Sequence, residues 1–529
     1  MITRTIPGAA LAAAIAAGAA WGCGPGRAGG AVEPAGGGGE APEDGTVEAV
    51  CPGTAAAALA AEEEPGIAAD VIDVALTIAG AMPPSPDGNA SLREVAGAYA
   101  SIGECAKARE ILEALLDTQA AGGAAGDAAL VASVYGLVGR CNDPGTIAWV
   151  GGVLDGALAE VRAARENDPG ALEPLFTEVV LGYLKLGRCD VAEDLAIDEL
   201  KAGDPAAYVD IAFYLDLEEC GADIPKILDL AMLAEEKLAA AKKRPEGEEA
   251  PTPDERIWSL TEIANAHASG GTTSGAAAAL AKAYAIFKKA KFEEIMDKAF
   301  AGYLLATSCW DAGNEQRATE ILDGLLKKGL ALPTSDDGII DKTYVVSTVA
   351  TTWIQLGEDG KAGEAIAALG AMEAESLDSL GAVLPEILEA QLEVLKEQAS
   401  AHLGKDEAAA AAAILPAAYD LAKQNGNPSS VASLAGSVAG DGNEDLVREI
   451  LEASIAWSLA KPKPDGWGLL AAARAYADMG EVARALEIVA MMPEPKHRVM
   501  GLCSVGRLIA AEGRFLTGAE SEKLRALAP

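Results

Sequence analysis

The sequence predicts an all-α fold in which antiparallel αα-hairpins stack into a solenoid. Three observations support this prediction. Half of the 529 residues are apolar, alanine (the best helix former) dominates that share, and only 4% of the residues are aromatic. Segments that alternate polar and apolar residues with a period of two, as strands require, are scarce. In addition, one pattern of an aromatic residue, a glycine and an alanine recurs along the chain.

The recurring pattern places a glycine four residues after an aromatic side chain and an alanine five residues after the glycine. Two further units keep this spacing but carry histidine or cysteine in the first position. The six triplets are Tyr99, Gly103, Ala108; Tyr183, Gly187, Ala192; Trp353, Gly357, Ala362; Tyr476, Gly480, Ala485; His267, Gly271, Ala276; and Cys309, Gly313, Ala318.

Each triplet predicts two helices joined by a tight turn. The positions eight, four and one before the glycine share one face of a helix, and the positions five and eight after it share a face of the next helix. Glycine readily adopts the left-handed conformation that ends a helix. Because neither helix can bury its apolar stripe alone, the hairpins are expected to stack.

The triplets resemble those of the tetratricopeptide repeat family, and the resemblance covers most of residues 47–529. It implies a right-handed superhelical solenoid. Some features depart from the family. The glycine-to-glycine spacing varies between 36 and 48 residues instead of being short and constant, and Pro144 stands where the alanine is expected. We therefore expect an irregular solenoid, with degenerate units near Gly221, Gly404 and Gly513.

Residues 1–22 predict an export signal of the lipoprotein type. The start of the chain is weakly basic, and residues 6–21 are free of charge but too short for a spanning helix. The string AWGC at residues 20–23 resembles the lipobox of bacterial lipoproteins, although its alanine and tryptophan differ from the family's usual residues. The resemblance implies lipidation of Cys23. The alternative is ordinary secretion with cleavage near residues 17–19, and both interpretations export the protein.

The rest of the chain divides into a linker and two repeat segments. Residues 23–46 combine glycine, proline and acidic residues without an apolar face, which predicts a flexible linker. Residues 242–256, KKRPEGEEAPTPDER, predict an exposed charged loop. This loop separates the N-terminal helical repeats, residues 47–241, from the C-terminal helical repeats, residues 257–529, and a shorter break follows at residues 461–466.

The cysteines leave two interpretations open. None forms a Cys-x-x-Cys pair, which argues against a zinc ribbon or a thioredoxin-like site. An oxidising compartment would permit disulfides between neighbouring helices, whereas buried free thiols are the competing interpretation. Both apply to the seven cysteines after Cys23, which are Cys51, Cys105, Cys141, Cys189, Cys220, Cys309 and Cys503.

The formal net charge of −39 excludes some classes of partner. A surface this negative repels the phosphates of nucleic acids and anionic lipid head groups, so no nucleic acid partner is expected. The scarcity of aromatic residues argues against a base-stacking surface and a deep sugar-binding cleft. We interpret the acidity as a solvated surface that keeps an alanine-rich protein soluble, and the alternative is a groove for a basic partner.

The histidines and acidic residues form no recognisable catalytic constellation. His267, His402 and His497 lie far apart in the sequence and are interpreted as structural or surface residues. Acidic pairs are too numerous for one pair to stand out for acid–base chemistry, and no Gly-x-Ser-x-Gly nucleophile motif occurs. The sequence therefore predicts no enzymatic site and no cofactor.

Two segments resemble ligand loops without satisfying their requirements. The segment that starts at Asp441 has the acidic spacing of a calcium loop, but Leu446 replaces the glycine that such a loop needs at its sixth position. We interpret Asn443 as the N-cap of a helix instead. Residues 270–275, GGTTSG, lack the lysine and the preceding strand of a phosphate-binding loop, and are interpreted as a turn between two helices. No metal site is predicted.

Together, these observations predict an exported, lipid-anchored helical-repeat scaffold that binds a protein or peptide partner in the bacterial cell envelope. Resemblance to tetratricopeptide lipoproteins implies roles such as assembling envelope or secretion machinery. The binding groove is expected on the first helix of each hairpin, facing away from the second. One alternative is an α-helical, αα-toroid-like enzyme acting on polysaccharide, which requires a carboxylate pair beside several aromatic side chains. The other is a passive structural surface component that self-associates.

Overall fold

A computed structural model describes residues 66–122, 127–166, 172–195, 209, 224–240, 251–333, 336–377, 384–440 and 442–528. Contacts divide the chain into two units, Met1–Glu64 and Pro65–Pro529, and every described residue lies in the second unit. The predicted signal segment, the linker, Cys51 and Cys220 therefore lie outside the described residues, and so does Cys23.

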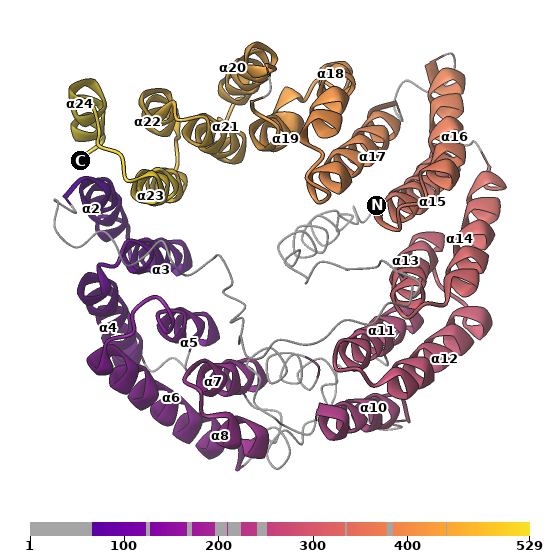
Figure 1. The fold of residues 1–529 in the computed structure, drawn as a ribbon, viewed down its shortest axis with the longest axis horizontal. Helices are drawn as coiled ribbons and strands as arrows, with labels where there is room; N and C mark the ends of the chain where they lie inside the picture. The colour runs from indigo at the N-terminus through magenta and orange to yellow at the C-terminus, as the bar shows by residue number, and fades with distance from the viewer. Residues whose placement is uncertain are drawn as a thin grey trace, which may run out of the picture. The chain divides into compact units, whose positions relative to one another are not determined.

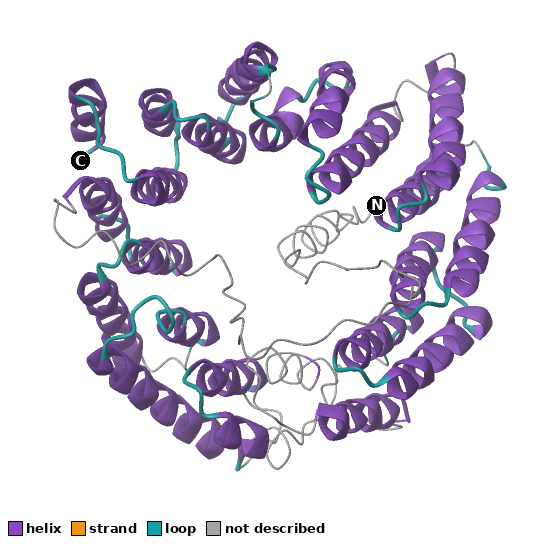
Figure 2. Ribbon diagram, in the orientation of Figure 1, coloured by secondary structure: helices purple, strands orange, loops and turns teal. Residues whose placement is uncertain are grey.

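Every regular element of the described ranges is helical (Figure 1, Figure 2), which confirms the predicted all-α class. The helices are α2 (Gly66–Gly80), α3 (Pro86–Ser101), α4 (Cys105–Gly122), α5 (Ala128–Tyr135), α6 (Pro144–Arg165), α7 (Glu173–Lys185), α8 (Cys189–Asp194), α10 (Ile224–Ala240), α11 (Pro253–Ser269), α12 (Thr273–Lys289), α13 (Ile295–Asp311), α14 (Glu315–Leu330), α15 (Asp336–Gln355), α16 (Asp359–Leu377), α17 (Leu384–Leu403), α18 (Ala408–Gln424), the 3₁₀ turn η2 (Pro428–Val431), α19 (Ala432–Ser437), α20 (Glu444–Ala460), α21 (Gly466–Asp478), α22 (Val482–Met491), α23 (Pro495–Glu512) and α24 (Gly518–Leu527).

Successive helices pack against each other as pairs. α3 packs against α4, α11 against α12, α13 against α14, α15 against α16, α17 against α18, and α21 against α22. The first helices of neighbouring pairs also touch, since α11, α13, α15 and α17 contact one another in turn, as do α19, α21 and α23. These two sets of contacts bury apolar stripes that no single helix can cover alone.

The glycines of the recurring pattern follow the first helix of each pair in the left-handed conformation. Their φ angles lie between +70° and +83°. A side chain at such a φ is strained, which explains why glycine stands at the ends of these helices. The six residues are Gly103, Gly187, Gly271, Gly313, Gly357 and Gly480.

The other positions of the pattern lie in the core. The four aromatic side chains are at most 2% exposed: Tyr99, Tyr183, Trp353 and Tyr476. The alanines of the same units, Ala108, Ala192, Ala362 and Ala485, are fully buried. The two substituted first positions, His267 and Cys309, are buried as well. Small alanines at these places let the two helices of a pair approach closely.

The first described helix, α2, packs against the second-to-last one, α23. α2 packs against α23 as extensively as the two helices of a sequential pair pack together, and α23 also contacts α3. Arg507 of α23 donates a hydrogen bond to the carboxylate of Glu94 in α3. Gly506 permits the close approach, because a Cβ atom there would lie 2.9 Å from Cγ1 of Ile72. α2 and α23 thus pack together like the two helices of a sequential pair, although nearly the whole unit separates them in sequence.

The helix α11 begins at Pro253, inside the segment predicted as an exposed loop over residues 242–256. The hydroxyl of Thr252 accepts a hydrogen bond from the N–H of Glu255 at 3.5 Å, and the Glu255 carboxylate accepts one from the N–H of Thr252 at 2.7 Å. This reciprocal capping box begins a helix, and proline is favoured in its first turn. The end of the predicted loop is therefore helical, while residues 241–250 lie outside the described ones.

Both interpretations of the cysteines apply, each to a different subset. Cys105, the first residue of α4, forms a disulfide with Cys141, which lies shortly before α6. Cys189 is also disulfide-bonded. Cys309 and Cys503 are buried free thiols. Burial raises the pKa of Cys309 to about 11 and that of Cys503 to about 12, so both remain protonated at neutral pH.

Candidate functional site

The tyrosines of the recurring pattern connect neighbouring helix pairs. Their rings are buried, and their hydroxyls donate hydrogen bonds to carboxylates on α2, α6 and α20, each of which precedes the tyrosine's helix in the chain. Burial and these bonds raise the pKa of each phenol above its ordinary value. The pairs are Tyr99 with Asp73, Tyr183 with Asp155 at 2.6 Å and Tyr476 with Glu452 at 2.8 Å. These residues join helices of the core, and they line neither of the two cavities described below.

An open groove of about 420 Å³ lies between α19 and α21. We call it the Trp467 groove. Both helices belong to the series of first helices that contact one another from pair to pair. The groove is lined by Ser433, Gly436, Ser437, Trp467, Leu470, Ala471, Arg474, Ala475 and Asp478.

Small residues allow the two walls of the groove to approach. A Cβ atom at Gly436 in α19 would lie 2.7 Å from the Cβ of Ala475 in α21, so any larger residue at 436 would push the helices apart. Beside this contact, Leu470 and Ala471 contribute the apolar part of the lining. The groove thus includes a point at which α19 and α21 are in close contact.

Trp467 is 58% exposed although it is a large apolar side chain. It stands at the start of α21, where the Asp465 carboxylate accepts hydrogen bonds from the N–H groups of Trp467 at 3.1 Å and Gly468 at 3.3 Å. Its ring packs edge-on against the ring of His497, with centroids 4.8 Å apart. The N-cap and the histidine therefore position an exposed indole, which offers a partner a large rigid contact surface.

The His497 ring supports Trp467 as an uncharged surface. It is 3% exposed, and neither ring nitrogen has a hydrogen-bond partner in the described part of the chain. Nδ1 lies 3.3 Å from Oε2 of Glu494, within ion-pair distance, but the bond angles do not make a hydrogen bond. Burial lowers the pKa of His497 more than Glu494 raises it, so the ring is neutral at pH 7.

Polar groups form the rim of the groove. Nε of Arg474 donates a hydrogen bond to Oγ of Ser504 at 3.2 Å, which leaves further N–H donors of the guanidinium for a ligand. Asp478 follows one turn later on the same helix face. On the opposite wall, the hydroxyls of Ser433 and Ser437 are exposed. The groove therefore combines an apolar lining with donors and acceptors on both sides.

The three histidines are not brought together. His267 is 2% exposed, and its Nδ1 lies 3.1 Å from Oγ1 of Thr272 in the following turn. Nδ1 of His402 lies 2.7 Å from the carboxylate of Glu407. Within the described ranges, no group of three or more His, Cys, Asp or Glu side chains is placed to hold a metal ion. None of the helices found there has the length and apolar character needed to cross a membrane.

The segment with calcium-loop spacing is largely helical, because α20 begins at Glu444. Asn443 occupies the N-cap position, as expected, but its side chain does not cap the helix. Its Nδ2 instead donates to the carbonyl of Val438 at 2.8 Å. Only the first half of the GGTTSG segment is the expected turn, with Gly271 at a φ of +72°. Its second half is helical, because α12 starts at Thr273.

Comparisons with known proteins add little. No family model matches the chain, and no curated protein matches it. Among solved structures, it is similar to Ton1535 from Thermococcus onnurineus NA1, with 17% sequence identity and a TM-score of 0.24, over 67% of this chain and 96% of that one. A similarity this low carries no argument about function, so the proposals below rest on the residues alone.

Proposed function

We propose that the protein is an exported, lipid-anchored helical-repeat scaffold that binds a protein or peptide partner in the bacterial cell envelope. The Trp467 groove is the observation that carries this proposal, because it exposes an indole beside an apolar lining with a polar rim. In the proposed arrangement, the helix pairs continue as a right-handed superhelical solenoid of tetratricopeptide type, and the groove lies on its first helices.

The composition of the groove suits recognition of a peptide side chain. Tryptophan and arginine are the residue types that most often dominate the energy of protein interfaces, and Trp467 and Arg474 both line the groove. Its volume of about 420 Å³ lies within the usual range for ligand pockets of about 300–1,000 Å³. An apolar side chain of a partner would pack against the exposed ring of Trp467, while the rim would bind its backbone.

The same lining favours binding over hydrolysis. Cleavage of a polysaccharide by a glycosidase normally needs two carboxyl groups that flank the scissile bond. The Trp467 groove has one carboxylate, Asp478, and a second cavity between α12 and α14 also has one, Glu320. Neither site therefore supports the alternative of an αα-toroid-like enzyme.

The disulfides support the proposal that the protein is exported. Such bonds persist in oxidising compartments and are rare in the reducing cytosol. Cys105 is bonded to Cys141, and Cys189 is bonded as well. Together with the uncharged stretch at residues 6–21, this favours a location outside the cytoplasmic membrane.

We expect the double substitution Trp467→Ala with Arg474→Ala to weaken binding of the partner at least tenfold, since truncating one interface hot spot costs about 2 kcal/mol or more. The measurement is cross-linking in cells from a photo-reactive residue at Ser437 on the groove wall, followed by mass spectrometry. One envelope protein should be captured reproducibly, and the double substitution should abolish its capture.

The matched control is Trp258→Ala, which removes a tryptophan that is 51% exposed on α11 and does not line the groove. It should leave the capture unchanged. Capture that persists in the double variant would show that the groove is not the binding site. Cross-links to copies of this chain alone would favour the passive surface component instead.

For the anchor, we expect Cys23→Ser to move the protein from the membrane fraction to the soluble fraction, because the serine variant lacks the thiol that the lipid modifies. Cys51→Ser makes the same chemical change beyond the predicted linker and should leave the protein in the membrane fraction. Membrane association of Cys23→Ser equal to that of the unchanged protein would contradict lipidation at this residue.

A further inference from the structure

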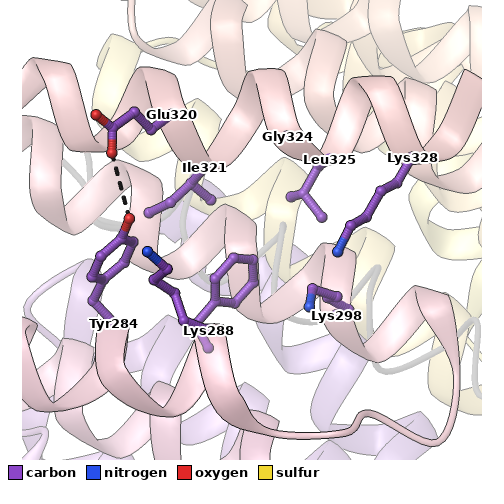
Figure 3. A pocket seen from close by; sticks show the side chains of 9 residues that line it. Tyr284, Lys288, Lys298, Glu320, Ile321, Gly324, Leu325 and Lys328 are labelled. Atoms are coloured by element: carbon purple, nitrogen blue, oxygen red, sulfur yellow. Dashed lines mark hydrogen bonds between the residues drawn. The ribbon is translucent and has the colours of Figure 1, made fainter.

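A second cavity, of about 230 Å³, lies between the end of α12, the first turn of α13 and α14 (Figure 3). We call it the lysine pocket. Three of its nine lining residues are lysines, in a chain whose net charge is −39. The lining consists of Tyr284, Phe287, Lys288, Lys298, Glu320, Ile321, Gly324, Leu325 and Lys328.

The positive charge of the pocket is not neutralised within the described part of the chain. None of its three lysines has a carboxylate within ion-pair distance there, whereas the nearby Lys282 pairs with Glu236. The one carboxylate in the lining, Glu320, accepts hydrogen bonds from the hydroxyl of Tyr284 at 3.4 Å and from the amide of Gln316 at 3.1 Å. An added anion would therefore meet ammonium groups that have no internal counterion.

Lys298 stands where a cation is disfavoured. It lies in the first turn of α13, near the positive end of the helix dipole. Figure 3 shows its ammonium group and that of Lys328 directed toward each other, with Lys288 at the other end of the pocket beside Tyr284. Burial and the neighbouring Lys328 lower the pKa of Lys298. An anion between the two ammonium groups would relieve this repulsion.

Aromatic rings hold two of the lysines in position. Nζ of Lys298 lies 5.0 Å from the ring centroid of Phe287 and 5.1 Å from that of Phe292. Nζ of Lys288 lies 5.3 Å from the ring centroid of Tyr284. These cation–π contacts limit the freedom of long side chains, so less entropy is lost when a ligand binds.

The lining between the lysines is apolar and open. Ile321 and Leu325 are buried, and a Cβ atom at Gly324 would meet no other atom within 4 Å. The cavity corresponds to the liquid volume of about eight water molecules. This room suits a small molecule with anionic groups at its ends.

We propose that the lysine pocket binds a small anion carrying at least two negative charges. Lys288 binds oxygens at one end of this ligand, Lys298 and Lys328 bind oxygens at the other, and its middle part lies against Ile321 and Leu325. The recognised chemistry is an oxyanion with at least two negative charges, either a phosphate compound or a di- or tricarboxylate. This inference does not depend on the Trp467 groove or on the partner proposed for it.

Charge compensation of helix dipoles does not account for this lysine cluster. The last turns of α12 and α14 each carry two lysines, and only one of each pair lines the pocket. Lys289 and Lys327 interact as favourably with the negative ends of the two helix dipoles, and neither of them lines the pocket. Lys298 lies at the opposite end of its helix, where the dipole gives no reason for a cation.

The test is isothermal titration calorimetry of the full-length protein at low ionic strength, with pyrophosphate and citrate as the two probes. We expect saturable binding to one site by at least one probe. Lys288→Met with Lys328→Met should weaken it at least tenfold, because each substitution removes a charge-assisted hydrogen bond to the ligand. Lys289→Met with Lys327→Met makes the same change of charge on the same two helices and should leave the affinity unchanged.

Each outcome decides the proposal. Binding of pyrophosphate alone assigns phosphate ligands to the pocket, binding of citrate alone assigns carboxylates, and binding of both supports the shared chemistry. The proposal is overturned if neither probe shows saturable binding. It is also overturned if the two double variants weaken binding equally, because equal weakening indicates general electrostatic attraction. Because Lys288 and Lys328 are exposed, their substitution should preserve the helical circular dichroism spectrum, which serves as the check on folding.

Discussion

Trp353→Ala is expected to lower the free energy of unfolding by about 3–5 kcal/mol, the usual cost of truncating a large buried aromatic side chain. Trp353 is 1% exposed and is the largest of the fully buried side chains of the described residues. Its ring packs edge-on against that of Trp310, with centroids 6.3 Å apart, and Nζ of Lys361 lies 4.2 Å from its centroid. Urea denaturation followed by helical circular dichroism measures the change.

The control for this substitution is Trp258→Ala, because the two variants lose the same atoms. Trp258 is 51% exposed, so its removal should lower the free energy of unfolding by clearly less than the removal of Trp353 does. If the two variants unfold at the same urea concentration, the buried ring of Trp353 does not stabilise the core more than an exposed ring does. A broadened transition for Trp353→Ala alone would indicate that its unit unfolds separately from the others.

The repeated helix pairs were predictable because their signals are local. Gly357 has a φ of +78° because it lies in a tight turn between two helices, and the surrounding residues already predict that turn. The apolar period before and after it identifies the two helices, and it places Trp353 and Ala362 in the core. The boundary at Pro253 was missed, although Thr252 and Glu255 have capping-box spacing, because the proline-rich composition dominated the interpretation.

Contacts between distant segments were not predictable. Arg507 and Glu94 are 413 residues apart, and nothing in either local sequence indicates that α23 packs against α3. The same limit applies to the Trp467 groove, whose two walls include Gly436 and Ala475. Such small residues are common in this alanine-rich chain, so their spacing alone does not reveal which helices come into contact.

The lysine pocket is the clearest example of a site that the local sequence does not predict. Lys288, Lys298 and Lys328 belong to three different helices, and each appears unremarkable in its own sequence context. Packing of α12, α13 and α14 brings them together, and no carboxylate of the described residues lies within ion-pair distance of them. This arrangement depends on side-chain direction as well as on sequence spacing. The excess of acidic residues in the chain as a whole gave no indication of a local basic cluster.

Cys105→Ser with Cys141→Ser is expected to lower the free energy of unfolding by about 2–4 kcal/mol. The disulfide closes a segment with a sequence separation of 36 residues, which spans α4 and α5. Opening it gives the unfolded chain more conformations, so the folded state loses relative stability. The measurement is thermal denaturation of the variant and of the unchanged protein, both purified without reductant.

Alkylation of the native protein, read by mass spectrometry, provides an independent control for this bond. Cys105 and Cys141 should resist the reagent until a reductant is added, whereas Cys309 and Cys503 should react only after unfolding, because they are buried thiols with raised pKa values. Equal thermal midpoints for variant and unchanged protein, or alkylation of Cys105 before reduction, would contradict the disulfide. Either result would also remove the support that this bond gives to export, and the proposal would then rest on the disulfide-bonded Cys189 and on the signal at residues 1–22.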